Sequence, residues 1–381
     1  MQKSILGCEM KIAIITLHRI VNYGSVLQAY ATQRVFEKLG QKVEFIDYFN
    51  ERMTLFGMLK RLKNKKKMLR NPLICFFAQI VMLPSYIRRF PVFWSFIKRF
   101  LHLSPRQYHS IDDLRMNVPV ADCYCTGSDQ VWNSNWNENI DEAFFLDFVP
   151  KGKPCFAYAA SFGKKKLDDW EIPETKCLLE KYFAISCREK YGIDILAGLN
   201  IASEQVLDPT LLLNAKDWNE IASKRFAGEK YVFVYNLNRS PKIDAVAAEL
   251  SNVKNIPIYT VSYCYHEIFS RKGKVFVCPK VEDFLSLIAN AEAVVTDSFH
   301  ATAFSINFSR NLFVVYPEFF SARLASIVEL VGLQQRVVGN QNVLEMDKQL
   351  INFKSVQEKL NLERKKSIHF LEDCLCRINH T

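Results

Sequence analysis

The sequence predicts an α/β protein built from two Rossmann-like, doubly wound domains that face each other across a cleft. Three observations lead to this prediction. The chain has 381 residues, which is too long for one ordinary core and suits two domains. A strand–helix–strand pattern occupies residues 11–48. A second series of alternating strand and helix patterns begins near Lys216, after the first series has ended.

The strand–helix–strand pattern near the N-terminus defines the first unit. Residues 11–17 form a short apolar run, which is typical of a buried parallel strand. Gly40 stands where a helix commonly ends, and residues 42–48 form the next apolar run. Between the two runs, apolar residues recur at helical spacing: Leu27, Tyr30, Ala31, Val35 and Leu39. Such a unit implies two parallel strands joined by a right-handed crossover.

Further patterns along the chain set the expected domain boundaries. Helices are predicted at 281–289, 301–308 and 322–331. Short apolar runs predict strands at 123–126, 155–160, 184–186 and 205–207 in the first series, and at 231–235, 258–261, 293–296 and 312–315 in the second. We expect an N-terminal domain at 10–215 with a helical insertion at 53–106, a C-terminal domain at 216–342, and a helical tail at 343–381.

The insertion at 53–106 carries the basic charge of the chain. The net charge is +10, and this segment holds twelve Lys or Arg residues and no Asp or Glu, so the remainder sums to 10 − 12 = −2. Its basic residues alternate with apolar ones, as in helices that lie in a membrane interface against anionic lipid. The alternative is that its helices pack on the first domain. Nucleic acid is not an expected partner, because no nucleic-acid-binding fold accompanies the charge.

The remaining composition is typical of a cytoplasmic protein, peripheral at the inner face of the membrane if the insertion binds lipid. Hydrophobic residues make up 49% of the chain and charged residues 24%. The longest apolar run, 73–83, is shorter than the roughly 20 residues that cross a bilayer. No signal peptide is evident. The 11 cysteines are scattered and form no C-x-x-C pair, so we expect reduced thiols, no metal site and no cofactor.

His300 is the most informative single residue. It follows the strand predicted at 293–296 and stands at the start of a predicted helix, beside Asp297 and Ser298. Ligands of open α/β sheets gather beyond the carboxyl ends of the strands, and helix N-termini favour anions. A histidine at this position can act as a general acid or base near neutral pH. The alternative is a histidine that is hydrogen-bonded within an ordinary strand–helix turn.

Arg188 follows the strand predicted at 184–186. An arginine at a strand end can bind a carboxylate or phosphate through two parallel hydrogen bonds. Its alternative is an ion pair with Glu189 or another acid.

Other predicted strand ends carry polar residues that suit donor or acceptor binding. Gly24 allows the backbone to approach a ligand, and Ser25 is a candidate helix N-cap, although a simple capped turn explains both equally well. Residues 129–133 combine polar groups with Trp132, a composition that suits a sugar, or a packed loop anchored by the indole. No G-x-G-x-x-G fingerprint is present. The candidate binding residues at these strand ends are Asn22, Tyr23, Gly24, Asp129, Gln130, Ser161 and Asp208.

Taken together, these segments resemble the polysaccharide pyruvyl transferase family. The resemblance covers roughly residues 11–332 and rests on six segments in order: 22–30 (NYGSVLQAY), 127–133 (GSDQVWN), 158–163 (YAASFG), 186–190 (SCREK), 206–210 (VLDPT) and 296–305 (TDSFHATAFS). It implies a fold like that of GT-B glycosyltransferases, phosphoenolpyruvate as the donor, and a ketal-linked pyruvate on a sugar as the product. It also implies that Arg188 and His300 belong to the donor site.

The sequence departs from the family pattern at two positions. Relatives often carry an arginine two residues before the histidine, where this chain has Ser298. If that arginine binds the donor, Arg323 or Lys190 is the expected replacement. The residue after the histidine is often glycine and here is Ala301, a mild change because alanine forms helices well.

The leading functional hypothesis is a transferase that moves a pyruvyl group from phosphoenolpyruvate to a sugar of a surface polysaccharide or its lipid-linked precursor. One alternative is a glycosyltransferase of the same two-domain plan that uses a nucleotide sugar. Another is a non-catalytic subunit that binds glycan or assembles a polysaccharide machine.

Overall fold

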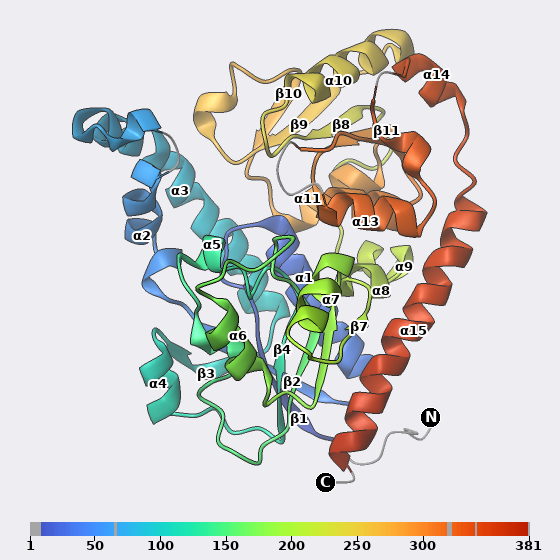
Figure 1. The fold of residues 1–381 in the computed structure, drawn as a ribbon. Coiled ribbons are helices and arrows are strands. Elements are labelled where there is room, and N and C mark those ends of the chain that lie inside the picture. Colours follow the sequence, from blue (N-terminus) through green and yellow to red (C-terminus); the bar gives the residue numbers. More distant parts are fainter. Residues whose placement is uncertain (1–8, 65–66, 318–321, 340, 380–381) are drawn as a thin grey trace.

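Two parallel sheets organise the chain. The computed structural model describes residues 9–64, 67–317, 322–339 and 341–379. The first sheet has seven strands in the order β3-β2-β1-β4-β5-β6-β7, and the second has five in the order β10-β9-β8-β11-β12 (Figure 1). All neighbouring strands run parallel. The prediction of two doubly wound α/β domains is therefore confirmed.

The strands are short and mostly buried on both faces, as parallel strands covered by helices must be. The first sheet contains β1 Lys11–Ile15, β2 Lys42–Tyr48, β3 Leu103–Tyr108, β4 Cys123–Thr126, β5 Cys155–Ala160, β6 Ala184–Cys187 and β7 Glu204–Gln205. The second contains β8 Val232–Tyr235, β9 Ile258–Ser262, β10 Lys274–Val277, β11 Ala293–Thr296 and β12 Asn311–Val314.

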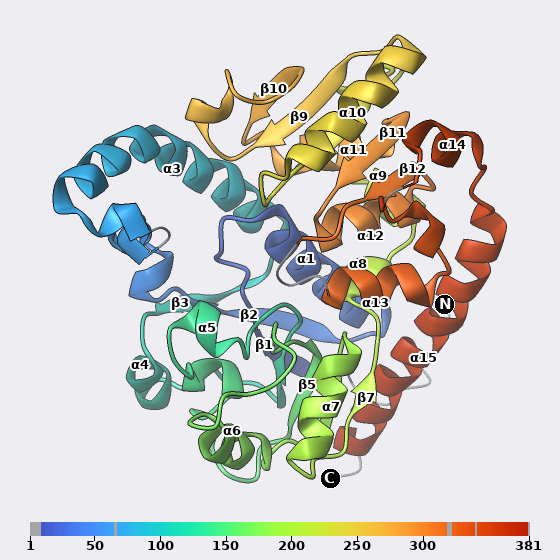
Figure 2. The same cartoon turned by 45° about the horizontal axis from the view of Figure 1, so that its top comes forward.

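Helices cover both sheets and connect them (Figures 1 and 2). Those of the first half are α1 Tyr23–Lys38, α2 Leu55–Lys60, α3 Pro72–Phe100, α4 Ile111–Met116, α5 Ser134–Asn137, α6 Ile172–Leu179, α7 Lys190–Gly198 and α8 Pro209–Leu212. Those of the second half are α9 Ala215–Asn219, α10 Pro241–Lys254, α11 Val281–Ala289, α12 Phe299–Asn307, α13 Ala322–Leu330, α14 Val343–Lys348 and α15 Phe353–Asn379.

Both sheets reverse their strand order at a switch point, between β1 and β4 in the first and between β8 and β11 in the second. Connections leave such a point in opposite directions and open a crevice beyond the carboxyl ends of the strands. The first crevice is bounded by α1, which begins because the Asn22 side chain accepts a hydrogen bond from the backbone N–H of Gly24. Asn22, and not Ser25, is therefore the N-cap. Gly40, with a φ of 79°, follows the end of α1 as predicted.

The two halves share one apolar core, which holds their crevices face to face. Tyr23 of α1 stacks on Phe284 of α11 with ring centroids 4.2 Å apart. Trp218, fully buried in α9, contacts the rings of Tyr30 in α1 and Phe304 in α12. Helix α15 then runs back along the first domain, where Ser367 accepts a hydrogen bond from the N–H of Leu207 (Figure 1).

The segment expected to be a helical insertion, 53–106, differs from the prediction at its end. Residues 103–108 form β3, the edge strand of the first sheet, because their N–H and C=O groups pair with β2. The helix before it, α3, also extends beyond the apolar run 73–83, across Pro84 and on to Phe100. At 29 residues it is long and apolar enough to cross a membrane by length and composition, the one such helix among the described residues.

Candidate functional site

A cavity of about 430 Å³ lies where the two switch points face each other. Its walls come from the loops that follow β1, β4, β8 and β11, together with α13. It brings together many residues that the sequence indicated separately: Asn22, Asp129, Gln130, Asp297, Ser298, His300 and Arg323. The carboxyl ends of two sheets thus contribute to one hollow, as expected for a ligand held between doubly wound domains.

His300 occupies the first turn of α12, whose N-cap is Ser298. The imidazole is buried, and its Nε2 atom has no hydrogen-bond partner among the described residues. Burial lowers the pKa of His300 to about 4, against the opposing charges of Asp208 and Asp129. The side chain is therefore neutral at pH 7 and can accept a proton. A buried, unpaired ring nitrogen on a cavity wall is costly unless a ligand uses it.

Gly24 lies directly against the imidazole of His300. A Cβ atom built at this position would stand 2.0 Å from the His300 Nδ1 atom and within 2.5 Å of the ring carbons. The glycine is therefore required by the close approach of α1 to α12, and this requirement comes from packing against the functional side chain.

We predict that Gly24→Ala lowers turnover about tenfold to a hundredfold while the protein still folds, because His300 must move away from its position. Alanine has the highest helix propensity, so the substitution itself should not destabilise α1. The matched control is Gly198→Ala at the end of α7, where an added Cβ atom meets nothing within 4 Å. Circular dichroism and steady-state turnover measure the two variants. Native turnover in the Gly24→Ala protein would contradict the placement of His300.

Arg188 lies at the centre of a buried group of carboxylates. Its guanidinium Nη1 is 2.8 Å from Asp208, its Nη2 is 3.2 Å from Asp129, and its Nε is 3.4 Å from Glu189. Only 1% of its side chain is exposed. Burial alone would lower the pKa of Arg188, but the three carboxylates raise it. The alternative expectation, an ion pair with Glu189 or another acid, is confirmed: Arg188 pairs with Asp208 and Asp129 as well as with Glu189.

The two aspartates beside Arg188 are held ionised. Burial opposes the charge of Asp129, but Arg188 and a 2.7 Å hydrogen bond from Ser25 lower its pKa to about 2. Asp208 is the N-cap of α8, and despite its burial the charge of Arg188 lowers its pKa as well. Asp129 has a φ of 80°, an unfavourable conformation for a residue other than glycine. The backbone is therefore strained at the point where its carboxylate meets Arg188.

Arg323, from the first turn of α13, is the cation that faces the cavity. No carboxylate among the described residues lies within ion-pair distance of it. Burial and the nearby charge of Arg188 lower its pKa. With its amide oxygen turned towards Arg323, Gln130 accepts hydrogen bonds from Nη1 and Nη2 at 2.9 and 2.8 Å. Arg323 also borders a second cavity, of about 330 Å³, together with Arg188 and Asp208.

The structure places other predicted residues away from the cavity wall. Tyr23 is buried between the domains, where its hydroxyl donates to the carbonyl of Pro279 at 2.6 Å. Ser161 is buried behind the site and donates a short hydrogen bond to Glu189. Lys190, the second expected replacement for the missing arginine, is exposed and lines neither cavity.

Asp297, in contrast, does line the cavity, where it accepts hydrogen bonds from the N–H groups of residues 237 and 238.

Trp132 has the second of its two expected roles, the anchor of a packed loop, and a different tryptophan lines the cavity. Trp132 is buried, and its indole N–H donates to the carbonyl of Phe144 at 3.1 Å, so it anchors the loop. Trp136, four residues later, is 45% exposed and lines the cavity. Sequence reasoning also did not single out Asn238, which lines the cavity from the loop after β8. A residue so far from the motifs in the sequence is found only through the fold.

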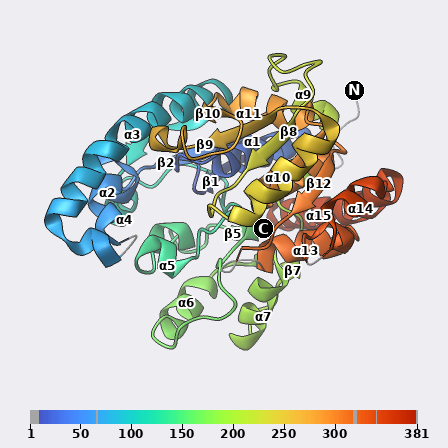
Figure 3. The same ribbon diagram turned by 90° about the horizontal axis from the view of Figure 1, so that it is seen from above.

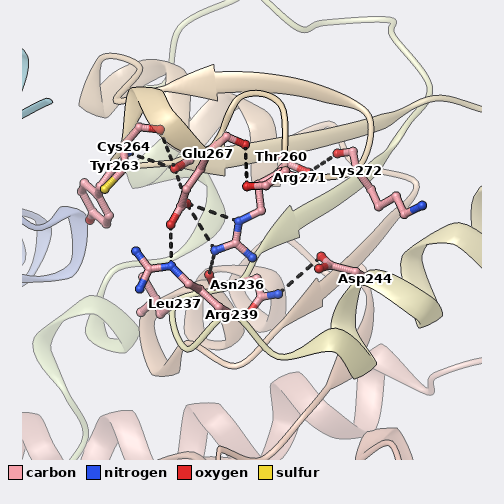
Figure 4. Close-up of polar contacts among 12 residues, drawn as sticks. Asn236, Leu237, Arg239, Asp244, Thr260, Tyr263, Cys264, Glu267, Arg271 and Lys272 are labelled. Carbon is pink, nitrogen blue, oxygen red and sulfur yellow. Dashed lines mark hydrogen bonds and ion pairs between the residues drawn. The ribbon is translucent and has the colours of Figure 1, made fainter. Parts of the chain in front are cut away.

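One group of described residues is spaced as metal ligands are: Cys264, His266 and Glu267, with candidate atoms within 4.8 Å of one another. The Glu267 carboxylate, however, already forms ion pairs with Arg239 at 2.6 Å and Arg271 at 3.3 Å (Figure 4). These contacts neutralise the one carboxylate of the group. We therefore infer that Glu267 stabilises the loop after β9 through these ion pairs.

A sequence profile of the polysaccharide pyruvyl transferase family matches residues 22–318, which is most of the chain. The chain belongs to this family. Membership makes the protein a transferase of polysaccharide biosynthesis and confirms the resemblance found in the motifs. The matched range includes Asp129, Arg188 and His300. A search of curated protein sequences finds no match for the chain.

Solved structures add evidence on the fold of the chain. The chain is similar to a UDP-N-acetylglucosamine 2-epimerase from Rickettsia bellii, with a TM-score of 0.56 and 11% identity over 98% of this chain and 99% of the other. A second UDP-N-acetylglucosamine 2-epimerase gives a TM-score of 0.54 and 12% identity over 98% and 97%. At this identity the likeness concerns the fold alone, and it confirms the GT-B-like arrangement.

Proposed function

We propose that the protein transfers a pyruvyl group from phosphoenolpyruvate to two hydroxyls of one sugar, in a surface polysaccharide or its lipid-linked precursor. The observation that carries this proposal is the composition of the cavity between the domains. It joins a neutral histidine, an arginine without a carboxylate partner among the described residues, and the N-terminus of α12. No resident metal or cofactor is needed in this scheme.

Arg323 and the first turn of α12 are the proposed contacts of the donor. An arginine binds a carboxylate or phosphate with two parallel hydrogen bonds, and free N–H groups at a helix N-terminus favour the same anions. Arg323 would thus replace the arginine that relatives often have at the position of Ser298. Arg188 is the less suitable contact, because its guanidinium already faces Asp208, Asp129 and Glu189.

His300 is the proposed proton carrier. A neutral imidazole accepts the proton of one sugar hydroxyl, and the hydroxyl oxygen bonds to C2 of the donor as the C2=C3 electron pair takes up this proton at C3. The anionic donor bound nearby would raise the pKa of His300, so that the ring can hold this proton and deliver it to C3. The C2–O bond to phosphate then breaks, and the second hydroxyl forms the second C2–O bond. One hydroxyl proton ends on C3 and the other leaves with phosphate, so the products are one ketal and one phosphate.

Trp136 and Asn238 are the proposed contacts of the acceptor. An exposed indole stacks on the apolar face of a sugar, and an amide can donate to and accept from hydroxyls. Asn22 and Asp297 contribute polar groups to the same wall. We place the reaction in the cytoplasm, where the precursor would be met at the inner face of the membrane.

The test is incubation of the purified protein with isotopically labelled phosphoenolpyruvate and a panel of lipid-linked and soluble oligosaccharides. We expect acceptor-dependent phosphate release and a product heavier by one pyruvate less one water, detected by mass spectrometry. Phosphoenolpyruvate should also raise the melting temperature, because it binds the folded state alone. Stabilisation and turnover by a nucleotide sugar instead would identify a glycosyltransferase, and the absence of both would identify a glycan-binding subunit.

A further inference from the structure

Helix α2 and the first half of α3 project from the body of the molecule and form what we call the arm, residues 55–64 and 67–87 (Figures 1 and 3). The arm exposes large apolar side chains that a soluble surface rarely gathers in one place. Leu73 is 70% exposed and Phe77 is 65% exposed. Exposed with them are Phe56, Met68, Ile74, Phe76, Ile80, Val81 and Ile87.

The exposed apolar residues of α3 follow the period of a helix. Leu73, Phe77, Ile80 and Ile87 are spaced by three, four or seven residues, which places them along one side. In an ordinary amphipathic helix, such an apolar side packs against the core of the protein. Here the side is open, and only 17% of the most apolar 18-residue window of α3 is buried.

The charged residues of the arm, which lie beside this apolar side, are all basic. Lys63, Lys67 and Arg70 are exposed and form no ion pair with any residue that the structure describes. Lys60 lies 3.7 Å from Glu51, which stands just before the arm. Residues 53–106 contain no Asp or Glu. A partner for this surface must therefore accept apolar side chains and supply negative charge.

The second half of α3 is anchored to both domains. Phe93 and Phe96 are buried in the shared core. The guanidinium of Arg89 donates to the carbonyl of Tyr263 at 3.1 and 3.2 Å, and Ser85 accepts from the N–H of residue 265 at 3.0 Å. The loop that receives them is the one fixed by Glu267 (Figure 4). The arm is therefore held at its base. It also contacts the body through Arg61, whose guanidinium lies 3.0 Å from Glu138, while the apolar side of α3 remains exposed.

The length of the free part distinguishes a surface helix from a spanning one. Residues 72–84, which precede the anchor at Ser85, extend over about 20 Å at the 1.5 Å rise of an α-helix, less than the roughly 30 Å of a hydrocarbon core. The anchored half cannot contribute, because it is packed between the domains. The free part suits a position in the membrane interface, with apolar residues in the acyl boundary and basic residues against headgroups.

We propose that the arm docks the protein on a bilayer that contains anionic lipid. The proposal extends the proposed function, because it brings a lipid-linked acceptor to the site. A cavity of about 630 Å³ connects the two: Met58 and Tyr86 of the arm form one side of it, and Asn22, Trp136 and Leu237 line both this cavity and the site. Four arginines also line it, and three of them, Arg19, Arg52 and Arg61, each pair with a carboxylate. Arg89 has no carboxylate partner among the described residues and is the one suited to a phosphate group of such an acceptor.

The test is flotation of the full-length protein with vesicles of phosphatidylglycerol and phosphatidylcholine, compared with phosphatidylcholine alone. We expect binding to the anionic vesicles that weakens as salt rises. Replacing Lys63, Lys67 and Arg70 by glutamine should weaken binding on the order of a hundredfold. The double variant Phe77→Ser/Ile80→Ser should weaken it at least tenfold. Leu350→Ser is the matched control and should bind normally, because Leu350 is 95% exposed outside the arm.

The outcomes distinguish this proposal from the proposed function. No flotation of the natural protein at low salt, or unchanged flotation of the Phe77→Ser/Ile80→Ser variant, would overturn membrane docking whatever the enzyme does. If sedimentation shows a dimer that the same variant abolishes, the arm is an interface between copies, and docking is wrong. With a water-soluble acceptor the variant should keep its turnover, whereas turnover on vesicle-borne acceptor should fall with binding. Loss of both activities alike would contradict a role in docking.

Discussion

We expect the His300→Gln variant to fold normally and to lose turnover by about 10²- to 10⁴-fold, the usual effect of removing one positioned acid or base. Glutamine retains hydrogen-bonding groups in the same pocket but cannot carry the proton between hydroxyl and donor. Acceptor-dependent phosphate release measures the effect. The matched control is His369→Gln, because His369 is exposed on α15 with 74% of its side chain accessible. Near-native turnover in His300→Gln would exclude proton transfer by this residue.

Stability measured against pH shows whether His300 is buried in its neutral form. The pKa of His300 falls from about 6.5 in the unfolded chain to about 4 in the folded one, so the unfolded state takes up a proton first as pH drops. Stability is therefore full above pH 6.5 and is lost as pH falls towards 4. Between pH 7 and pH 5 the natural protein should lose about 2 kcal/mol more than His300→Gln. His18, whose pKa is also lowered by burial, is common to both proteins and cancels.

The architecture was predictable from the sequence because parallel strands are short, apolar and followed by polar residues. Helix α11 and strand β11 begin and end where the patterns placed them. Helix α12 begins two residues earlier than expected, since Ser298 caps it, and this brings His300 into its first turn. Strand β3 was not predicted, because its sequence contains Pro105 and the charged Arg106, which an edge strand tolerates.

The candidate site was predictable in part for a different reason. Residues that follow strands next to a switch point lie close together in space, however the chain between them is folded. This applies to Asn22, Asp129 and His300. Pairing among those residues is not visible in a sequence. Nothing in the order of residues indicates that Arg188 faces three carboxylates while Arg323, over a hundred residues later, faces none that the structure describes. These differences arise because Arg188 directly follows β6, beside the acids that follow β4 and β7, whereas Arg323 comes from helix α13.

Replacing Arg188 by methionine should destabilise the protein by about 3–5 kcal/mol, the usual cost of removing one partner from a buried ion pair. The side chain is buried, and its removal leaves the carboxylates of Asp129, Asp208 and Glu189 without their shared counter-ion. Arg188→Lys should recover only part of this, because an ammonium group cannot face several carboxylates with a planar fork. Denaturant unfolding at pH 7 measures both variants, and equal stability of all three proteins would contradict this account.

The direction of the pH effect provides a second test of the Arg188 group. In the natural protein the pKa of Asp129 is lowered to about 2, so its contribution is present above pH 3.8 and is lost as pH falls further. Without Arg188, burial raises this pKa, and the folded state then binds protons more readily than the unfolded one. The deficit of Arg188→Met should therefore shrink as pH falls from 7 towards 4. A deficit that stays constant with pH would mean that lost packing, and not unpaired charge, causes it.

A double-mutant cycle separates the counter-ion role of Arg188 from donor binding. Asp208→Asn removes one of the charges but keeps the N-cap of α8, since asparagine caps helices as well as aspartate does. Added to Arg188→Met, it should restore part of the lost stability, whereas alone it should destabilise the protein. If Arg188→Lys instead leaves stability intact and only weakens the apparent affinity for phosphoenolpyruvate, then Arg188 binds the donor directly. Arg323 would then have to be assigned to the acceptor side of the cavity.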